Sequence, residues 1–370
     1  MSTECTAAES LKVLAFEGWD AGSHRAVRES IERHGRHQWQ WQTLPRGNWR
    51  WRLRLGAVDL VREAEAAGVL AQSWDVLFAT SMVSLSDLAA LLPPEIAARP
   101  RVLYMHENQA AYPSAAGRAD PRDAHAAVTN LTSMLAADVV LWNSSWNRAS
   151  FLEAMEAVLR ARTDQADTGM LEEIRSKSSI AWPPVECPTA SDPEVLHNAS
   201  KARARGLTLV AWPHRWEHDK GPDELLRIEH EYGAEARIGW VLLGEQFDRQ
   251  PPAFRQLLEH AGDRVLHAGT AARGVYETWL VACDWVVSTA NHEFFGIAVT
   301  EALLAGCMPW LPERLSYPEL VPAAFRGYSP MQPPDEPEAM IAAIRAHVSN
   351  ARAETAVRRI EAAIPHRKDD

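Results

Sequence analysis

Short apolar runs alternate with amphipathic, helix-like segments along most of the 370-residue chain. In the first half, the apolar runs predict strands at 11–17, 75–80, 101–105 and 138–142. The segments beside them predict helices at 22–34 and near 55–70, 122–137 and 145–161. The second half predicts strands at 207–212, 238–243, 264–267, 285–288 and 307–311, and helices near 222–233, 272–282 and 296–305. This βαβα rhythm is typical of parallel α/β sheets with helices on both faces.

A break at Trp182-Pro183-Pro184, followed by a polar stretch to Gly206, separates the two halves. We therefore expect four parts: an N-terminal domain at 1–185, a linker at 186–206, a second domain at 207–335, and a C-terminal helix and tail at 336–370 with the helix at about 338–362. Open α/β sheets bind ligands at the carboxyl ends of their strands. Two doubly wound, Rossmann-like domains that face each other would hold a ligand in a central cleft.

The charge distribution is uneven. The chain has 38 basic and 49 acidic residues, so its net charge is −11, which argues against a general nucleic-acid coat protein. Residues 25–54, however, contain eight Arg against two Glu, or +6, together with four of the 15 Trp. Arginine pairs with phosphates and tryptophan stacks on unpaired bases. This segment is either a local nucleic-acid surface or an amphipathic segment whose Trp side chains belong to the core.

Other features narrow the class of protein. No apolar run reaches the roughly 18 residues of a membrane-spanning helix. The first ten residues lack the basic and apolar regions of a secretory signal. Four irregularly spaced cysteines argue against a disulfide framework and a structural zinc site. We expect a cytoplasmic protein with reduced thiols and no membrane association.

The strongest motif runs from His292 to Pro309, after a predicted strand. Gly296 opens its helix, and Glu301 interrupts an apolar stripe formed with Ile297 and Leu304. A carboxylate on such a stripe is costly unless something hydrogen-bonds it. Glu293 precedes the helix, whose free N–H groups favour an anion. The alternative is a helix with one stray Glu and an N-terminal cap.

A second loop, 212–222, follows the first strand of the second half. Arg215 and Lys220 lie five residues apart, so both can converge on one phosphate group. Taken alone, this loop would more simply be solvated surface.

Two further loops follow strands of the first half. His106-Glu107-Asn108-Gln109 comes directly after a strand and has no HExxH spacing, so it does not indicate zinc. Polar groups at the carboxyl end of a strand occupy a binding position, and the alternative is a single histidine satisfied within the core. Glu17 to His24 contains Gly18 and Gly22, which allow a tight strand-to-helix turn, although this is neither GxGxxG nor a P-loop.

At these residues the chain resembles retaining GT-B glycosyltransferases, which carry a Glu-x7-Glu pattern (Glu293 and Glu301) and an Arg/Lys pair (Arg215 and Lys220). More narrowly, residues 47–54, 106–109 with Tyr112-Pro113, 215–226 and 291–303 resemble the tRNA-queuosine α-mannosyltransferase family. The resemblance covers about residues 11–312. One departure is Ala21, where the family pattern predicts glycine.

The resemblance implies a retaining transfer of mannose from GDP-mannose to queuosine in the anticodon of tRNA-Asp, without a metal or other cofactor. It assigns four residues to the reacting centre: His106, Arg215, Lys220 and Glu293. It assigns eight to the donor, namely Gly22, Arg215, Lys220, Glu293, Phe295, Gly296, Ile297 and Glu301, with Glu293 on the sugar and Glu301 on the ribose. We expect the tRNA to contact His24, Arg46, Trp49, Arg50, Trp51, Arg52, Arg54, Glu107, Asn108 and Gln109.

Three alternatives stay open on the residues alone. The first is a GT-B glycosyltransferase with a small-molecule or lipid acceptor. The second is a non-catalytic tRNA-binding protein, which the intact Glu and Arg/Lys residues disfavour. The third is a nucleotide-sugar epimerase, which shares the two-domain architecture. Spacing alone does not identify the nucleotide, the sugar or the oligomeric state.

Overall fold

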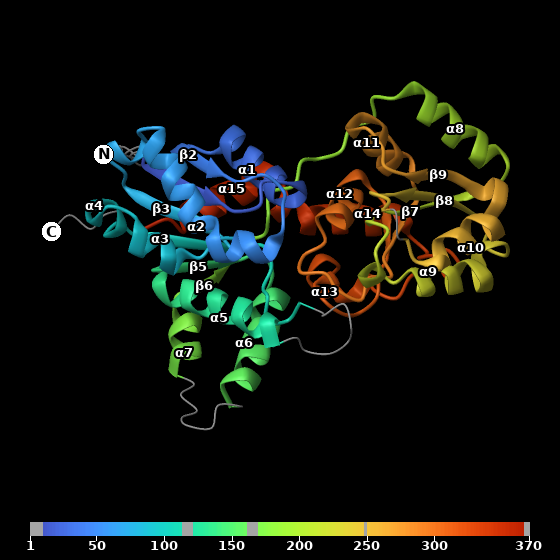
Figure 1. Ribbon diagram of the computed structural model, residues 1–370. Helices are drawn as coiled ribbons and strands as arrows, with labels where there is room; N and C mark the ends of the chain where they lie inside the picture. The colour runs from blue at the N-terminus through green and yellow to red at the C-terminus, as the bar shows by residue number, and fades with distance from the viewer. Residues whose placement is uncertain (1–9, 113–120, 161–168, 248–249, 366–370) are drawn as a thin grey trace, which may run out of the picture. The chain divides into compact units, whose positions relative to one another are not determined.

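The computed structural model describes residues 10–112, 121–160, 169–247 and 250–365 (Figure 1). The chain forms two compact units. Unit 1 extends to residue 184 and is completed by the segment from residue 353 onward, and unit 2 comprises residues 185–352. Within the described ranges, no helix is both long enough and apolar enough to cross a membrane.

Unit 1 contains a six-stranded parallel sheet in the order β2-β1-β3-β4-β5-β6. Its strands are β1 (Lys12–Glu17), β2 (Gln38–Thr43), β3 (Val76–Thr80), β4 (Arg101–Met105), β5 (Val139–Trp142) and β6 (Ser178–Ile180). Its α-helices are α1 (Gly22–His34), α2 (Trp49–Ala66), α3 (Leu85–Leu91), α4 (Pro94–Ala97), α5 (Pro121–Ala136), α6 (Ser145–Arg160), α7 (Gly169–Ser176) and α15 (Ala353–Ala362). The central strands are almost wholly apolar, as expected for strands that helices cover on both faces.

Unit 2 contains a five-stranded parallel sheet in the order β11-β10-β7-β8-β9. Its strands are β7 (Thr208–Trp212), β8 (Ile238–Leu243), β9 (Val265–Gly269), β10 (Trp285–Val287) and β11 (Met308–Trp310). Its α-helices are α8 (Pro193–Ala204), α9 (Pro222–Ile228), α10 (Pro252–Ala261), α11 (Arg273–Ala282), α12 (Ile297–Ala305), α13 (Tyr317–Leu320) and α14 (Pro337–Val348). Two parallel α/β sheets confirm the predicted fold class.

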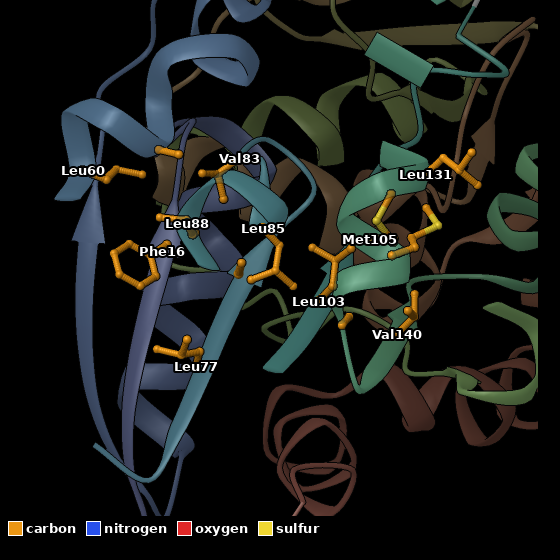
Figure 2. Close-up of a cluster of buried hydrophobic side chains, with 14 of the residues drawn as sticks. Phe16, Leu60, Leu77, Val83, Leu85, Leu88, Leu103, Met105, Leu131 and Val140 are labelled. Atoms are coloured by element: carbon orange, nitrogen blue, oxygen red, sulfur yellow. The ribbon is translucent and has the colours of Figure 1, made fainter. Parts of the chain in front are cut away.

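Each unit has its own hydrophobic core. In unit 1, Phe16, Leu77 and Leu103 on the strands pack with Leu60 and Leu88 on the helices (Figure 2). In unit 2 the core is rich in tryptophan, with Trp212, Trp216 and Trp240 all buried, and Trp216 stacks on Phe254 at 4.5 Å. Much of the unusual tryptophan content therefore fills the core of unit 2.

Several predicted elements need correction. The single helix predicted at 338–362 is wrong: α14 and α15 are separate, and a short 3-10 turn lies between them. The segment predicted as a linker contains α8. The helix predicted from about residue 55 begins at Trp49, where the Asn48 side chain accepts a hydrogen bond from Arg50 N at 3.1 Å. The edge strands β2 and β6 were not predicted, because half-exposed edge strands lack a continuous apolar run.

Helix α15 is fastened to unit 1 by the buried carboxylate of Glu361, and it packs beside α1 (Figure 1). This carboxylate accepts hydrogen bonds from Arg36 N at 2.9 Å, His37 N at 3.2 Å and Trp39 Nε1 at 3.1 Å. The C-terminal segment is thereby hydrogen-bonded to the residues that lead into β2 and to the Trp39 side chain on that strand.

Replacing Glu361 with alanine would leave these donors buried without their acceptor. We expect the free energy of unfolding of unit 1 to fall by about 3 kcal/mol, since hydrogen bonds to charged groups are among the strongest. Denaturant unfolding measures this loss. Glu354→Ala, at an exposed site on the same helix, is the matched control. Equal stability of the two variants would contradict the assigned role of Glu361.

Candidate active site

Two loops of unit 2 lie side by side because β10 pairs with β7 in parallel. One loop follows β7 and the other follows β10, and both leave the carboxyl edge of the sheet. Their backbones interlock: Asp219 O accepts a hydrogen bond from Asn291 N at 2.8 Å, and Thr289 Oγ1 donates to Lys220 O at 2.7 Å. The structure therefore brings the two strongest sequence motifs of unit 2 together.

The amino group of Lys220 is buried between these loops. Its Nζ donates a hydrogen bond to His292 O at 2.9 Å and lies 3.0 Å from Asp219 Oδ2 and 3.5 Å from Glu293 Oε2. Burial lowers the pKa of Lys220, but the Glu293 and Asp219 carboxylates more than offset this, so the pKa lies above its ordinary value. Lys220 therefore remains a charged ammonium.

Glu293 keeps part of its side chain accessible, with 22% exposed. Burial raises the pKa of Glu293, but Lys220 outweighs it and holds the pKa below its ordinary value. The side chain is thus an ionised hydrogen-bond acceptor at the edge of the sheet. A carboxylate in this state suits a ligand that presents hydroxyl donors.

The backbone turns sharply after Glu293 to enter α12. Gly296 caps the helix with φ +94, a left-handed conformation that glycine adopts without steric cost. Phe295 is buried, and its carbonyl accepts a hydrogen bond from Ser316 Oγ at 2.8 Å. Ile297 opens the helix, whose first N–H groups have no acceptor within it and favour an anion.

Arg215 is the more exposed of the two predicted phosphate-binding cations. Its side chain is 48% exposed, and Nη2 lies 3.0 Å from Glu217 Oε2. The neighbouring His214 is uncharged at neutral pH, because burial and the nearby Lys220 lower its pKa to about 4. Buried His214 Nε2 has no hydrogen-bond partner among the described residues. The cationic side chains at this edge therefore include Arg215 and Lys220, together with Arg314, whose Nη2 donates to Ala290 O at 3.0 Å.

Glu301 lies on α12, one turn after Ile297. It has two partners that the sequence did not indicate. Its Oε1 lies 2.7 Å from Arg273 Nη1, and its Oε2 accepts a hydrogen bond from Tyr276 at 2.7 Å. Burial raises the pKa of Glu301, and Arg273 and Tyr276 offset only part of this shift. Both partners lie on α11, more than 20 residues away, so no local motif points to them.

In unit 1, Glu17 at the end of β1, His24 on α1 and His106 after β4 form a buried cluster. Glu17 Oε2 lies 3.0 Å from His24 Nδ1, and the two imidazole centroids are 4.1 Å apart. Each of the three residues offers one ligand atom, and these atoms lie within 4.8 Å of one another. Among the described residues, this is the one group of this kind that could hold a metal ion. His24 and His106 are candidate site residues from the sequence, whereas Glu17 has no predicted role.

The residues after His106 differ in burial, and the buried ones support the loop. Asn108 is fully buried, and its amide donates to Asn147 Oδ1 at 2.8 Å while its carbonyl accepts from Ala111 N at 2.7 Å. Gln109 is also buried and donates to Glu107 Oε1 at 2.8 Å. Asn108 thus holds the loop in shape, and Glu107 is its more accessible member.

Gly22 opens α1 in a left-handed conformation, with φ +53. A methyl group at this position would meet no atom of the chain within 4 Å. No atom of the chain therefore obstructs the backbone at this turn, and the assignment of Gly22 to the donor stays a prediction.

The basic, tryptophan-rich segment separates into two parts. Trp39 and Trp41 on β2 stack on each other at 5.6 Å and pack against Phe78. Both are half-buried on this edge strand. Trp49 and Trp51 instead begin α2, and Trp51 is 63% exposed.

The first turns of α2 form one wall of a pocket of about 320 Å³. Its lining includes Trp49, Arg50, Trp51 and Arg54 of α2 and Ala126 and Thr129 of α5. Arg46, Arg50 and Arg54 are exposed, whereas Arg52 is half-buried with its guanidinium folded over Gly47. This pocket combines aromatic faces with positive charge.

Comparison with known proteins identifies the family. Residues 12–185 match the model described as tRNA-queuosine α-mannosyltransferase N-terminal. The chain is 33% identical over 318 residues to the tRNA-queuosine α-mannosyltransferase of Drosophila melanogaster, covering 84% of this chain and 81% of that one.

Solved structures show the same fold at lower identity. Anabaena Alr3699/HepE in complex with UDP and glucose is 18% identical, with a TM-score of 0.63 over 95% of this chain and 98% of that one. The catalytic domain of Arabidopsis thaliana starch synthase IV, bound to ADP and acarbose, is 12% identical, with a TM-score of 0.61 over 97% and 96%. These likenesses confirm the predicted GT-B fold, and the sequence relationships confirm the predicted resemblance. The chain belongs to the tRNA-queuosine α-mannosyltransferase family of GT-B glycosyltransferases.

Proposed function

We propose that this protein transfers mannose from GDP-mannose to queuosine in the anticodon of tRNA-Asp, with retention of configuration at the anomeric carbon. The observation that carries the donor half is the charged Lys220 beside the ionised Glu293 at the entry to α12. A nucleoside diphosphate sugar presents an anion and hydroxyl groups together, and this site offers a cation and an acceptor together.

The charges that develop during the reaction determine the role of each residue. The bond between the anomeric carbon and the phosphate oxygen breaks, so positive charge develops on the sugar and negative charge on the diphosphate. Lys220, Arg215 and the N–H groups that open α12 stabilise the diphosphate as that charge grows. Glu293 accepts hydrogen bonds from sugar hydroxyls, and the family resemblance assigns His106 to the reacting carbon.

The acceptor hydroxyl then attacks the face that the phosphate leaves. Its oxygen forms the new bond to the anomeric carbon, and its proton passes to the departing phosphate oxygen. Two side-chain cations supply the positive charge at the diphosphate, so the reaction needs no divalent metal.

The pocket at the start of α2 supports the acceptor half. Arg50 lies over the Trp49 ring at 4.5 Å from its centroid, and Trp51 presents an exposed aromatic face. An unpaired base stacks on such faces, while exposed arginines pair with the flanking phosphates. A protein with a net charge of −11 thus needs to be basic only where it meets the anticodon arm.

Direct assay tests the reaction. Incubation with GDP-mannose and a pre-folded, queuosine-containing anticodon stem-loop of tRNA-Asp should add one hexose to queuosine, as detected by nucleoside mass analysis. The same yield is expected in EDTA, because Arg215 and Lys220 supply the charge. Activity that disappears in EDTA and returns with magnesium would contradict metal independence, and transfer to small acceptors alone would favour the small-molecule alternative.

The two glutamates of the donor site should differ in effect. Glu301→Ala should weaken GDP binding roughly tenfold or more, because a hydrogen bond from the ribose to a charged acceptor is lost. Glu293→Ala should leave GDP affinity near the wild-type value and impair transfer, because GDP has no sugar for Glu293 to hold. Calorimetric titration with GDP measures both, and equal losses would refute the division of roles.

The salt dependence of tRNA binding should identify the acceptor surface. Replacing Arg46, Arg50 and Arg54 with glutamine should reduce the slope of log affinity against log salt by about 0.7–0.9 for each phosphate that is no longer neutralised. Arg62→Gln, exposed on the same helix roughly 12 Å further along, is the matched control.

Trp51→Ala completes this experiment. Loss of a stacked base should cost about 1–3 kcal/mol of binding with little change in the salt slope. GDP affinity should be unchanged in all these variants, because the donor loops lie in the other unit. An unchanged slope in the folded triple-arginine variant would exclude this segment from the tRNA site.

A further inference from the structure

Glu301 is a buried carboxylate on α12 whose two oxygens are held from a neighbouring helix. Its side chain is 9% exposed. Oε1 lies 2.7 Å from Arg273 Nη1, and Oε2 accepts a hydrogen bond from the Tyr276 hydroxyl at 2.7 Å. Arg273 and Tyr276 both lie on α11, which packs against α12. The carboxylate therefore has a different partner at each oxygen, and both partners belong to the same unit as Glu301.

Arg273 is itself held by contacts with its neighbours. Its Nε donates a hydrogen bond to Glu277 Oε1 at 2.5 Å, one turn further along α11, and its guanidinium lies over the Tyr276 ring at 5.4 Å from the centroid. The other oxygen of Glu277 accepts hydrogen bonds from Thr189 N and Oγ1, each at 3.3 Å. The guanidinium thus reaches Glu301 from a defined position, although about half of its side chain is exposed.

The two contacts leave part of the Glu301 carboxylate available. An ionised carboxylate has about four lone-pair positions, two on each oxygen. Arg273 occupies one position on Oε1, and Tyr276 occupies one on Oε2. Within the described part of the chain, the Glu301 carboxylate has no other hydrogen bond or ion pair. One acceptor position therefore remains on each oxygen.

The same two partners favour the ionised form of Glu301. Burial, together with the nearby Glu277 charge, raises the pKa of Glu301, whereas Arg273 and Tyr276 lower this pKa. A protonated carboxyl group would lose part of its capacity to accept hydrogen bonds. The two side chains of α11 thus help to preserve the acceptor that they hold.

We propose that Arg273 and Tyr276 are positioning residues of the donor site: they hold the Glu301 carboxylate so that each oxygen keeps one acceptor position for a ribose hydroxyl. This inference rests on the proposed function, which assigns Glu301 to the ribose of the donor nucleotide.

Preorganisation is the physical reason for this role. A glutamate side chain that rotates freely loses that freedom when a ligand binds, and the entropy cost weakens the complex. In this structure, contacts from α11 restrict the side chain before any nucleotide arrives. The 2′ and 3′ hydroxyls of a ribose are adjacent donors, so they match two oxygens that each keep one position. A nucleotide without these hydroxyls would gain nothing from the arrangement.

Calorimetric titration with GDP and with 2′,3′-dideoxy-GDP tests the inference. The second ligand keeps the base and the diphosphate but lacks both ribose hydroxyls, so wild-type protein should bind it more weakly than GDP. Tyr276→Phe and Arg273→Met should each weaken GDP binding by roughly three- to tenfold, the effect of one hydrogen bond, and leave dideoxy-GDP binding nearly unchanged. A purely structural role would weaken the binding of both ligands equally.

A double-mutant cycle tests whether Tyr276 acts through Glu301. In a Glu301→Ala background, Tyr276→Phe should have no further effect on GDP affinity, because the carboxylate that it positions is gone. Tyr232→Phe is the matched control. It removes the hydroxyl of another half-buried tyrosine of unit 2, which interacts with Glu231 instead of Glu301, and it should leave the affinity for both ligands unchanged.

Three results would overturn the inference. One is an equal loss of affinity for GDP and dideoxy-GDP in Tyr276→Phe. Another is an undiminished effect of Tyr276→Phe in the Glu301→Ala background, which would mean that Tyr276 contacts the nucleotide directly. The last is tighter GDP binding by Arg273→Met, which would mean that the guanidinium competes with the ribose.

Failure of the proposed function gives a different result. If the wild-type protein binds GDP but transfers no mannose to tRNA, the proposed reaction is wrong, and the titrations still decide the roles of Arg273 and Tyr276. If it binds no GDP, the proposed donor is wrong, and the same comparison is made with UDP and its dideoxy form. A wild-type protein that binds neither diphosphate more tightly than its dideoxy form would overturn the inference as well.

Discussion

Parallel strand pairing is the constraint on which both sites depend. Because every strand of a sheet runs in the same direction, the loops at their carboxyl ends gather along one edge. The alignment of β1, β3 and β4 brings Glu17 and His106 together across nearly 90 residues. The pairing of β10 with β7 does the same for Glu293 and Lys220. Neither group of residues is close in sequence, and each is assembled by the sheet.

Charge is balanced differently at the two edges. In unit 2, Lys220 stays charged between two carboxylates and faces a site that would receive an anion. In unit 1, the buried Glu17 carboxylate lies 3.0 Å from His24 Nδ1, and burial together with the neighbouring His24 holds the pKa of His106 well below its ordinary value. Such a division suits a transferase, in which the leaving group becomes more negative while the transferred sugar becomes more positive. A non-catalytic binding protein would have no comparable need for either arrangement.

The sequence predicted the fold where local patterns are strong. Buried strands such as β8 appear as continuous apolar runs, and α12 has clear glycine signals at both ends. It failed where the decisive contacts are distant: β2 is a strand only because it pairs with β1, and Arg273 meets Glu301 only through packing of α11 on α12. The basic segment showed the same limit, since its tryptophans differ in surroundings: Trp41 is half-buried against Phe78, whereas Trp51 is exposed.

The path of the chain has a consequence for the order of folding. Unit 2 is a continuous stretch, whereas unit 1 includes α15, whose Glu361 meets Arg36 from 325 residues away. During synthesis, all residues of unit 2 are made before those of α15. Until α15 is made, the Trp39 indole on β2 lacks its hydrogen bond to Glu361. Closing so long a loop is slow relative to local contacts. The hydrogen bonds from Glu361 to Arg36 and His37 therefore form after the second unit has been made, and partly folded intermediates of this kind are prone to wrong contacts.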